Sequence, residues 1–403
     1  MSVPIPAIML PKLAYLSTPE GAASLGRVMD DPRDDLSLAS APWMRALPAW
    51  QRTALLEQRG LRMRGLRKQK RAAEMFFTPL GLQQMTTDEI ARYKAARLPH
   101  GVRAIADLCC GPGGDSLPLP PHITVFGVDR DAEALRAYRH NVALHRPSGG
   151  SAMAVLADVT RFEARTGTLD GIFLDPARRT LADTHRDRDF DTEPEPGWDA
   201  LTALTRKFRN AVLKLGPGTR LPEDLAEEEC EYIGLRDECL ELTVRTGAFG
   251  RRGWVRAVEL PAGAVVEATV ADREDSFGNV QEPGAWFYEP VKSVVRAHLF
   301  GIVAAQHGLW QLDARTAYLG GDEAVESPLL KRYRVLKLLP VDERALRAEL
   351  AADDVGTLEI KKRGLDIVPE QWRKKLKPKG PNATTLVFTR LQGKPAVLRV
   401  ERQ

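Results

Sequence analysis

The residues best suited to chemistry begin with a glycine-rich loop, Asp107-Leu108-Cys109-Cys110-Gly111-Pro112-Gly113-Gly114-Asp115, which follows a short apolar run over 102–108. Glycines let a backbone approach a bound ligand closely and adopt the positive φ that tight turns need. The dinucleotide pattern G-x-G-x-x-G fits poorly, because Ser116 holds its last position and acidic Asp115 would lie close to a pyrophosphate. A ligand with positive charge suits this loop better.

Three more aspartates each follow a short apolar run that predicts a strand. Asp129 follows 124–128, Asp158 follows 154–156, and Asp175 follows 171–174. Open α/β sheets bind their ligands beyond the carboxyl ends of the strands, so these acids and Asp107 are expected at one edge of one sheet. Turn glycines and scattered surface acids are the alternative to such a site.

The loop resembles motif I of the class I S-adenosylmethionine-dependent methyltransferases, which reads D-x-x-C-G-x-G-G-D. The resemblance implies S-adenosyl-L-methionine as the cofactor, since its zwitterionic methionine part and its sulfonium cation favour acids beside the glycines. It implies that the methionine part is lined by residues of the loop: Asp107, Gly111, Gly113 and Gly114, with Asp115 nearby. By the same resemblance, Asp129 accepts both ribose hydroxyls and Asp158 contacts the adenine amino group.

The stretch Ile172-Phe173-Leu174-Asp175-Pro176-Ala177-Arg178-Arg179 is similar to motif IV of the same enzymes, which in many amino-methylating members reads D/N-P-P-Y. The resemblance implies that Asp175 and the carbonyl of Pro176 hold the target nitrogen. Ala177 and Arg178 replace the second proline and the aromatic that stacks on the base. In-line methyl transfer needs a positioned nucleophile and an acceptor for its proton, and Asp175 is the expected acceptor.

Two arginines of this stretch, Arg178 and Arg179, can hold a phosphate or a base carbonyl with forked donors, although a strand-terminal turn with surface arginines is the alternative. The polar stretch 180–197 is long for a loop inside a compact domain, and we interpret it as a flap that substrate orders. Lys214, in an expected strand over 211–215, can face the same cleft. The absence of a cysteine from 172–179 argues against the covalent mechanism of uracil-C5 methylation.

These acids need a parallel sheet to bring them together, and the order of elements predicts one. From residue 101, the expected strands alternate with helices over 131–144 and 198–209, the pattern of an α/β fold. Further strands are expected at 239–244, 254–260 and 265–270, and a helix at 291–306. Residues 1–100 have helical periodicity, while 331–403 alternate strands (334–338, 357–361, 385–389, 396–400) with helices (342–350, 370–376).

We therefore expect four parts. Residues 1–100 form an all-helical N-terminal domain, and 101–262 form a Rossmann-like sheet of the class I methyltransferase type. Residues 263–330 form a connector with its own small packing unit, and 331–403 form a small basic α+β domain. A length of 403 residues agrees with two to four domains.

Positive charge is concentrated at the C-terminal end. The chain carries 58 Lys+Arg and 54 Asp+Glu, a net +4, but 331–403 hold 18 basic and 9 acidic residues, or +9, which leaves −5 elsewhere. The basic residues form two groups: Lys361, Lys362 and Arg363 after a strand, and Arg373, Lys374, Lys375 and Lys377 beside Trp372. Such groups suit phosphate contacts, while a solvated face with Trp372 in the core is the alternative.

A second run, 52–71, holds eight basic residues and one acid, and is equally typical of a solvated helix face and of a nucleic-acid contact.

Composition and cysteine usage exclude several classes of protein. Apolar residues make up 43% and charged residues 28%, and no run approaches the ~18–20 apolar residues that span a bilayer. Four cysteines are too few for a disulfide framework, and no CxxC pair or His/Cys cluster suggests a metal. Prolines interrupt the apolar start, which does not resemble a signal peptide. We expect a cytoplasmic protein with no structural metal and no membrane contact.

The helical N-terminus, the motif IV stretch and the basic C-terminal region together resemble bacterial methyltransferases that carry a C-terminal THUMP-like domain. THUMP domains are RNA-binding modules of tRNA-modifying enzymes, so the resemblance implies methylation of a base nitrogen in structured RNA, tRNA or rRNA. Two alternatives stay open. One is a methyltransferase of proteins or small molecules whose C-terminal region is an interaction domain. The other is a non-catalytic RNA-binding protein with a degenerate scaffold, against which the intact acids Asp107, Asp129, Asp158 and Asp175 argue.

Overall fold

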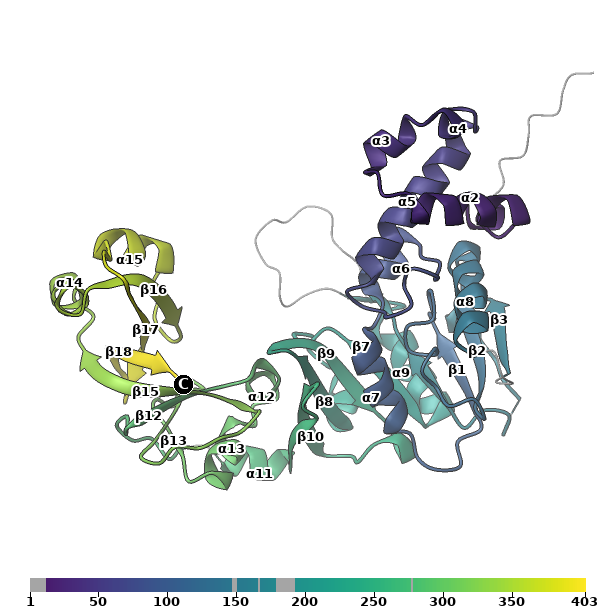
Figure 1. Cartoon of the computed structure of the whole chain (residues 1–403). Coiled ribbons are helices and arrows are strands. Elements are labelled where there is room, and N and C mark those ends of the chain that lie inside the picture. The colour runs from purple at the N-terminus through teal and green to yellow at the C-terminus, as the bar shows by residue number, and fades with distance from the viewer. Residues whose placement is uncertain (1–11, 147–150, 166, 179–192, 277) are drawn as a thin grey trace, which may run out of the picture. The chain divides into compact units, whose positions relative to one another are not determined.

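The computed structural model describes residues 12–146, 151–165, 167–178, 193–276 and 278–403 (Figure 1). The chain divides into two compact units. The first holds Met1–Leu215, Thr219–Leu225 and Val244–Arg251, and the second holds Gly216–Gly218, Ala226–Thr243 and Arg252–Gln403. No described helix is long and apolar enough to cross a membrane.

The expected all-helical N-terminus is confirmed. It comprises α1 (Lys12–Leu16), α2 (Pro19–Asp30), α3 (Asp35–Ala39), α4 (Pro42–Arg45), α5 (Ala49–Gly65), α6 (Pro79–Gln84) and α7 (Asp88–Ala96). Side chains start several of these helices where the backbone needs acceptors: Thr18 accepts from Gly21 N, and Thr78 accepts from Gly81 N. Leu16, Val28 and Leu55 are buried in the core between α1, α2 and α5.

Most basic side chains of the run 52–71 form hydrogen bonds within this unit. Its side chains donate to main-chain carbonyls of loops and helix ends in the same unit: Arg52 to Arg45 and Leu47, Arg59 to Asp31 and Arg33, Arg62 to Glu74 and Met75, Lys68 to Leu82, Gln83 and Met85, and Arg71 to Leu144. Loop carbonyls that have no partner in regular secondary structure must find donors elsewhere. The run therefore holds loops against a helix, which favours a structural role over a nucleic-acid contact.

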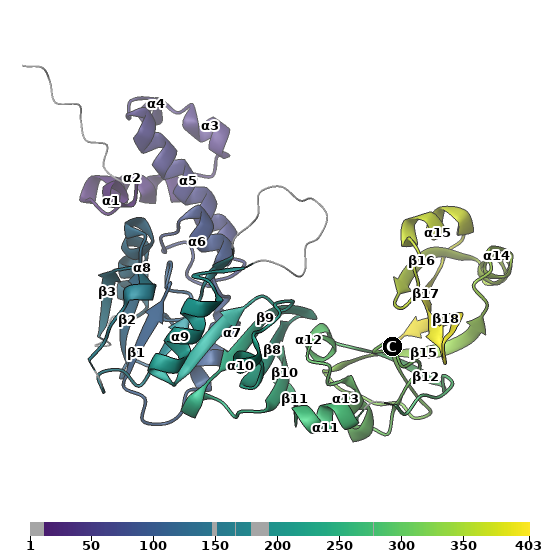
Figure 2. The same cartoon turned by 180° about the vertical axis from the view of Figure 1, so that it is seen from behind.

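The expected α/β architecture is confirmed, and it places the predicted acids at one edge. The parallel strands β1 (Ala104–Leu108), β2 (Thr124–Asp129), β3 (Ala152–Leu156), β4 (Gly171–Leu174) and β7 (Ala211–Leu215) are arranged in the order β7-β4-β1-β2-β3. β1 and β4 are buried apolar runs, as in sheets covered on both faces. α8 (Ala132–His145) packs against β2 and β3, and Figure 2 shows α9 (Trp198–Phe208) in front of the sheet seen from behind. The short strands β5 (Ala177–Arg178) and β6 (Pro194–Glu195) pair with each other beyond β4.

The first unit also contains three short helices: η1 (Val159–Arg161), most of α10 (Glu223–Ala226) and η2 (Gly247–Phe249). The second unit opens with β8 (Glu229–Leu235), most of β9 (Glu238–Arg245), β10 (Trp254–Leu260) and β11 (Ala264–Thr269). β10 pairs in parallel with β8 and antiparallel with β11, and α11 (Val270–Asp275) follows. The strands predicted at 239–244, 254–260 and 265–270 are present.

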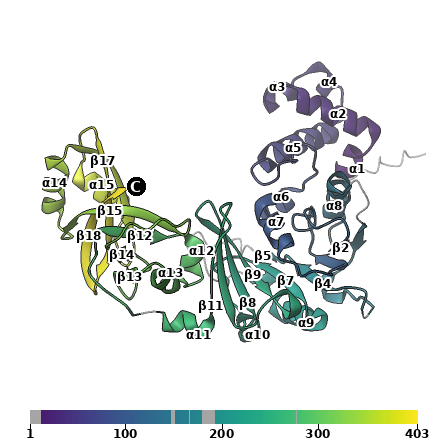
Figure 3. The ribbon, with the colours of Figure 1, turned by 60° about the horizontal axis from the view of Figure 1, so that its bottom comes forward.

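The second sheet of this unit contains the C-terminal α+β fold. Its strands are β12 (Trp286–Pro290), β13 (Trp310–Gln311), β14 (Leu319–Gly321), β15 (Leu330–Leu339), β16 (Val355–Lys362), β17 (Asn382–Leu391) and β18 (Lys394–Arg402), in the order β13-β14-β12-β15-β18-β17-β16. α14 (Glu343–Ala352) and α15 (Pro369–Leu376) lie side by side in Figure 3 and bury Leu346, Leu350 and Leu376 in the core below. The predicted elements of 331–403 are all present.

The segment 263–330 differs from the expected connector. β12 pairs antiparallel with both β14 and β15, so this segment builds the same sheet as the C-terminal residues. The helix expected at 291–306 is two helices, α12 (Lys292–Arg296) and α13 (Phe300–Gln306), separated at His298, whose φ is +55°. Apolar periodicity runs through that break because buried side chains on both helices face one core. The four-part division stays a prediction beside the two units seen.

Candidate active site

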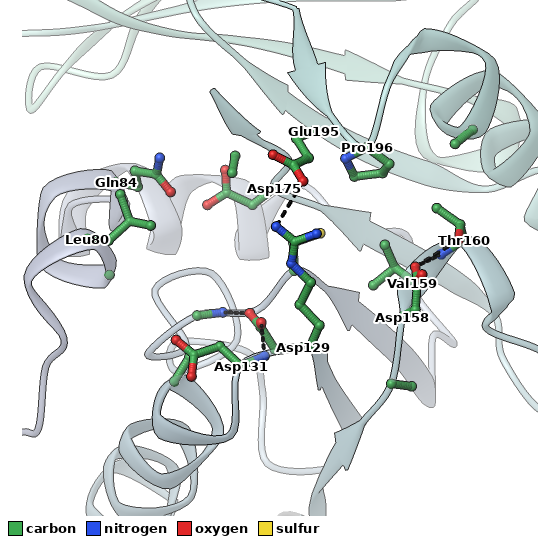
Figure 4. A pocket seen from close by; sticks show the side chains of 18 of the residues that line it. Leu80, Gln84, Asp129, Asp131, Asp158, Val159, Thr160, Asp175, Glu195 and Pro196 are labelled. Atoms are coloured by element: carbon green, nitrogen blue, oxygen red, sulfur yellow. Dashed lines mark hydrogen bonds and ion pairs between the residues drawn. The ribbon is translucent and has the colours of Figure 1, made fainter. Parts of the chain in front are cut away.

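A cleft of about 490 Å³ lies in the first unit, at the carboxyl ends of β1, β2 and β4 (Figure 4). That volume lies within the roughly 300–1,000 Å³ usual for small-molecule sites. Its lining residues come from the glycine-rich loop, the strand ends, α6 and the start of α9. They include Thr78, Leu80, Gln84, Cys109, Gly111, Asp129, Arg130, Asp158, Val159, Asp175, Glu195 and Pro196. The sequence-predicted Asp129, Asp158 and Asp175 thus line one cavity, as expected from parallel strands.

The glycine-rich loop needs its glycines for two separate reasons. Gly111 and Gly113 have φ of +50° and +96°, in the left-handed region that side chains disfavour. Tyr138 of α8 packs directly beneath, so a Cβ at Gly113 would lie 3.1 Å from its ring, and one at Gly127 of β2 would lie 2.3 Å from it. The loop therefore turns tightly and packs closely on an aromatic ring, and of its glycines Gly111 lines the cleft.

The acids at the ends of β2 and β3 hold local turns. The Asp129 carboxylate accepts the backbone N–H of Gly111 at 3.0 Å and that of Asp131 at 2.9 Å. Asp158 accepts both the backbone N–H and the hydroxyl of Thr160, and these bonds hold the pKa of Asp158 below its usual value. Each carboxylate is therefore fixed in direction beside the cleft, and the lowered pKa favours the ionised form of Asp158.

One ion pair crosses the lining of the cleft. Nη2 of Arg130, directly after β2, lies 2.9 Å from Oε1 of Glu195 in β6, and Figure 4 shows this contact above Asp129. Glu195 lies within the stretch 180–197 that the sequence predicts as a flap. Most of that stretch, with Arg179 and the side chain of Arg178, lies outside the described residues. Only 193–197 can be placed, with Pro194 and Glu195 paired to β5.

Beneath the glycine-rich loop lies a group of buried charges. Lys94 of α7 and Asp115 expose 1% and 6% of their side chains, and their Nζ and Oδ1 atoms are 2.7 Å apart. Burial acts to raise the pKa of Asp115, but the charges of Lys94 and Lys214 outweigh it and hold that pKa below its ordinary value. For Asp107, burial and the nearby charge of Asp115 raise the pKa to about 8, although the hydroxyl of Ser116 donates to it. The apo protein therefore holds one acid ionised and one protonated at neutral pH.

Asp175 lies between this buried group and the cleft. Its side chain is 26% exposed, and its Oδ2 accepts the ammonium of Lys214 at 2.7 Å. The same ammonium donates to the carbonyl of Gln84 at the end of α6, at 2.8 Å. Burial raises the pKa of Asp175, and Lys214 opposes that shift. Asp175 can therefore accept a proton more readily than a surface carboxylate does, which suits a general base.

The sequence motifs did not identify several residues of the site, because these residues belong to the helical N-terminal region. α6 and the turn after it pack on the loop so closely that a Cβ at Gly81 would lie 3.0 Å from Pro112, and one at Gly114 would lie 2.9 Å from Met85. The start of α6 has a signal, a Thr-Pro pair typical of an N-cap followed by proline at the first helical position. Nothing local to Lys94 indicates that it pairs with Asp115.

The residues predicted to bind RNA lie in the second unit and fall into two environments. The ammonium of Lys361 is 2.8 Å from the carboxylate of Glu289, and Arg363 lies over the ring of Tyr318 at 4.8 Å. Lys362 donates to the carbonyl of Ile367. Arg373, Lys374, Lys375 and Lys377 are all exposed at the end of α15. Among them Arg373 donates to the carbonyl of Leu358 and the ammonium of Lys375 lies over Trp372, which packs partly buried against Phe388.

Comparison with known proteins agrees with this geometry. The chain is 34% identical to an uncharacterized S-adenosylmethionine-dependent methyltransferase of Mycobacterium tuberculosis over 329 residues, in both strains CDC 1551 and H37Rv. The match covers 79% of this chain and 86% of the relative. The chain belongs to the S-adenosylmethionine-dependent methyltransferases. S-adenosyl-L-methionine is accordingly the cofactor of this enzyme.

Two further comparisons concern the fold of the methyltransferase. A crystal structure of a methyltransferase candidate from Porphyromonas gingivalis W83 superposes with a TM-score of 0.77 at 20% identity, covering 94% of this chain and 98% of that one. Residues 330–402 match the THUMP domain-like family. The class I methyltransferase fold and the C-terminal THUMP-like domain are both confirmed. Among the described residues, no group of three or more His, Cys, Asp or Glu side chains is arranged to hold a metal ion.

The buried pair predicts a large stability effect. Lys94→Met should lower the free energy of unfolding by about 3–5 kcal/mol, because it leaves Asp115 buried without its main counter-charge. The matched control is Arg92→Met on the same helix, where an exposed arginine lies 2.9 Å from Asp88 and the pair is worth about 0–1 kcal/mol. Urea denaturation of both variants measures the difference. Equal stability of the two would show that the buried pair does not hold α7 in place.

The raised pKa of Asp107 predicts a pH dependence in the cofactor-free protein. The folded state keeps this proton up to about pH 8, whereas the unfolded state loses it near the ordinary value of 3.8. The folded state therefore binds more protons between these values, and the contribution of Asp107 to stability falls as pH rises across that window. Asp107→Asn should remove this contribution, so its stability relative to the wild type should increase from pH 5 to pH 8. A constant difference across that range would contradict the buried, protonated state.

Proposed function

We propose that this methyltransferase methylates a base nitrogen in a structured RNA, tRNA or rRNA. The observation that carries the proposal is that one chain contains both an acid suited to accept a proton and a domain of the THUMP-like type. Asp175 lies at the cleft with its charge balanced by Lys214, and the THUMP-like residues 330–402 present an exposed basic group at the end of α15.

The residues of the cleft fit the cofactor by their chemistry. Gly111 lines the cleft, and a smaller adjoining pocket is lined by Gly111, Gly114, Asp107 and Asp115, while Gly113 lines neither. This set suits a zwitterionic methionine part. Asp129 is directed beside the cleft and suits the ribose hydroxyls, and Asp158 suits the adenine amino group. The bound cofactor supplies an electrophilic methyl group on a sulfonium. The chain itself needs to hold the nucleophile in line and take up its proton.

We assign that second task to Asp175. Oδ2 holds Lys214, so Oδ1 is the oxygen for the target N–H, and the carbonyl of Pro176 is a second acceptor for it. Burial raises the pKa of this carboxyl, and the charge of Lys214 opposes that rise. Arg178, whose backbone pairs with Pro194, is assigned to a phosphate or base carbonyl of the substrate.

We assign the main RNA contacts to the basic group at the end of α15, and a smaller part to the group 361–363. The charge of Lys361 is compensated by Glu289, with which it shares a partly buried site, and a paired cation gives up an existing contact to meet a phosphate. Arg373, Lys374, Lys375 and Lys377 are exposed and follow one another around a helix end, so several can meet one backbone. Exposed Lys362 and half-buried Arg363, which lies over the ring of Tyr318, stay part of the proposed RNA surface.

Two aspartates should give opposite kinetic signatures. Asp129→Asn should weaken cofactor binding about tenfold or more, because a charge-assisted bond to ribose is worth about 1.5–3 kcal/mol. Asp175→Asn should leave cofactor affinity nearly intact and lower kcat by about 10²–10⁴, since it removes the proton acceptor. Calorimetry gives the affinities and single-turnover transfer gives the rates, with exposed Glu163→Gln as the control. A loss of cofactor binding in Asp175→Asn that matches its loss of rate would instead place Asp175 in the cofactor pocket.

The basic surface predicts the salt dependence of RNA binding. Neutralising Lys374, Lys375 and Lys377 to Gln should lower the slope of log K against log salt by up to about 2–3, at roughly 0.7–0.9 per lost phosphate contact. The control neutralises Lys292, Lys337 and Lys394, three exposed lysines of the same unit, and should change the slope less. Deleting 331–403 should weaken RNA binding while cofactor binding survives. Full-length protein that binds no structured RNA would favour the protein or small-molecule substrate.

A further inference from the structure

The wall of the cleft beside Asp175 is a short helix from the N-terminal region. Leu80 and Gln84 of α6 both line the cleft that Asp175 lines, and Figure 4 shows them together on that helix at the Asp175 end of the pocket. They are four residues apart, so their side chains lie on the same helix face. This wall lies about a hundred residues from motif IV in the sequence, and neither motif accounts for it.

α6 is held in place from three directions. The ammonium of Lys68 donates to the carbonyls of Leu82, Gln83 and Met85 at 2.9, 2.7 and 3.0 Å, which satisfies the acceptors at the helix end. Lys214, the partner of Asp175, donates to the carbonyl of Gln84. Gly81 packs on Pro112 of the glycine-rich loop. The backbone under Leu80 and Gln84 is therefore fixed relative to both the loop and Asp175, as a recognition site requires.

The two side chains offer complementary chemistry to a flat heterocycle. Leu80 is apolar and yet 57% exposed. Single exposed leucines are common on protein surfaces, but this one lines the cleft. The described lining residues include no aromatic side chain, and Ala177 also lines the cleft close to Asp175. Bases that enter active sites are held between aromatic or apolar side chains and are read along their edges by hydrogen bonds. A glutamine amide offers both a donor and an acceptor for such an edge.

We propose that Leu80 and Gln84 are specificity-determining residues, with Leu80 as the apolar platform for the target base and Gln84 as the amide that reads its edge beside Asp175. This inference rests on the proposed RNA function. It assigns to the helical N-terminal region a direct contact with the substrate. Because α6 is bonded to Lys214 through Gln84, the same helix positions both the base and the acid that acts on it.

The test measures transfer of the labelled methyl group from S-adenosyl-L-methionine into total RNA, which is taken from a strain of the source organism that lacks the gene. The wild type and three variants are compared. Leu80→Ala should raise the apparent KM for RNA about tenfold, and Leu80→Phe, which offers a larger flat surface, should keep or lower it. Gln84→Ala should spread the label over more than one nucleoside in mass spectrometry, since an unread edge no longer rejects other bases. Cofactor Kd should stay within about twofold of the wild type throughout.

The matched control is Gln83→Ala, an exposed neighbour on α6 that is not among the residues lining the cleft. It should behave as the wild type. If the wild type labels RNA and the Leu80 and Gln84 variants match Gln83→Ala, the inference fails while the proposed function stands. If cofactor affinity falls in step with KM, the two residues belong to the cofactor site and the inference is wrong. If the wild type labels no RNA, the proposed function fails and this inference fails with it.

Discussion

Carboxylates gathered at the ends of parallel strands repel one another, and the first unit offsets that repulsion with two lysines. The charge of Asp115 acts to raise the pKa of both Asp107 and Asp175. Lys94 pairs with Asp115, and Lys214 pairs with Asp175. Without these cations the burial of the acids would force them to take up protons, and the cleft would lose the charges that a cationic cofactor and a proton-accepting step need. The arrangement also gives the acids different states, since Asp107 stays protonated while Asp115 stays ionised.

This charge balance makes the helical region part of the site. Lys94 is carried by α7, and the carbonyl that receives the ammonium of Lys214 is at the end of α6. The contact of Gly81 with Pro112 completes the attachment on the cofactor side. A segment that looks from its periodicity like a separate helical domain therefore serves as one wall of the cleft. Its basic side chains, such as Lys68 and Arg62, are used to hold that wall together rather than to extend a positive surface.

The second unit shows why net charge alone is a weak guide to a binding surface. Residues 331–403 carry +9, yet Lys331 and Lys361 share carboxylates of Asp237 and Glu289 in strands and turns earlier in the chain. These lysines count toward the net charge of the region, but neighbouring carboxylates neutralise them. The positive charge that stays exposed is concentrated at the end of α15, where lysines follow one another around the last helical turn. β15 of this domain pairs with β12, so the THUMP-like region shares one sheet with the segment before it.

Local pattern missed β8 and β12 to β14, but it was enough to predict β1, β2, β3, β4 and β7, the glycine-rich loop and the meeting of Asp129, Asp158 and Asp175 at one cleft. Each depends on a few neighbouring residues, and the rule that parallel strands end at the same edge supplies the rest. The elements of 331–403 were predictable for the same reason. Tertiary structure alone decided the partners of the charged groups: Lys214 meets Gln84 from 130 residues away, and Lys361 meets Glu289 from 72 residues away. It also decided that the helix expected at 291–306 breaks at His298 and that β12 pairs with β15. Hydrogen bonds and ion pairs act over a few ångströms in space, and the sequence pattern around one partner carries no record of where the other will lie.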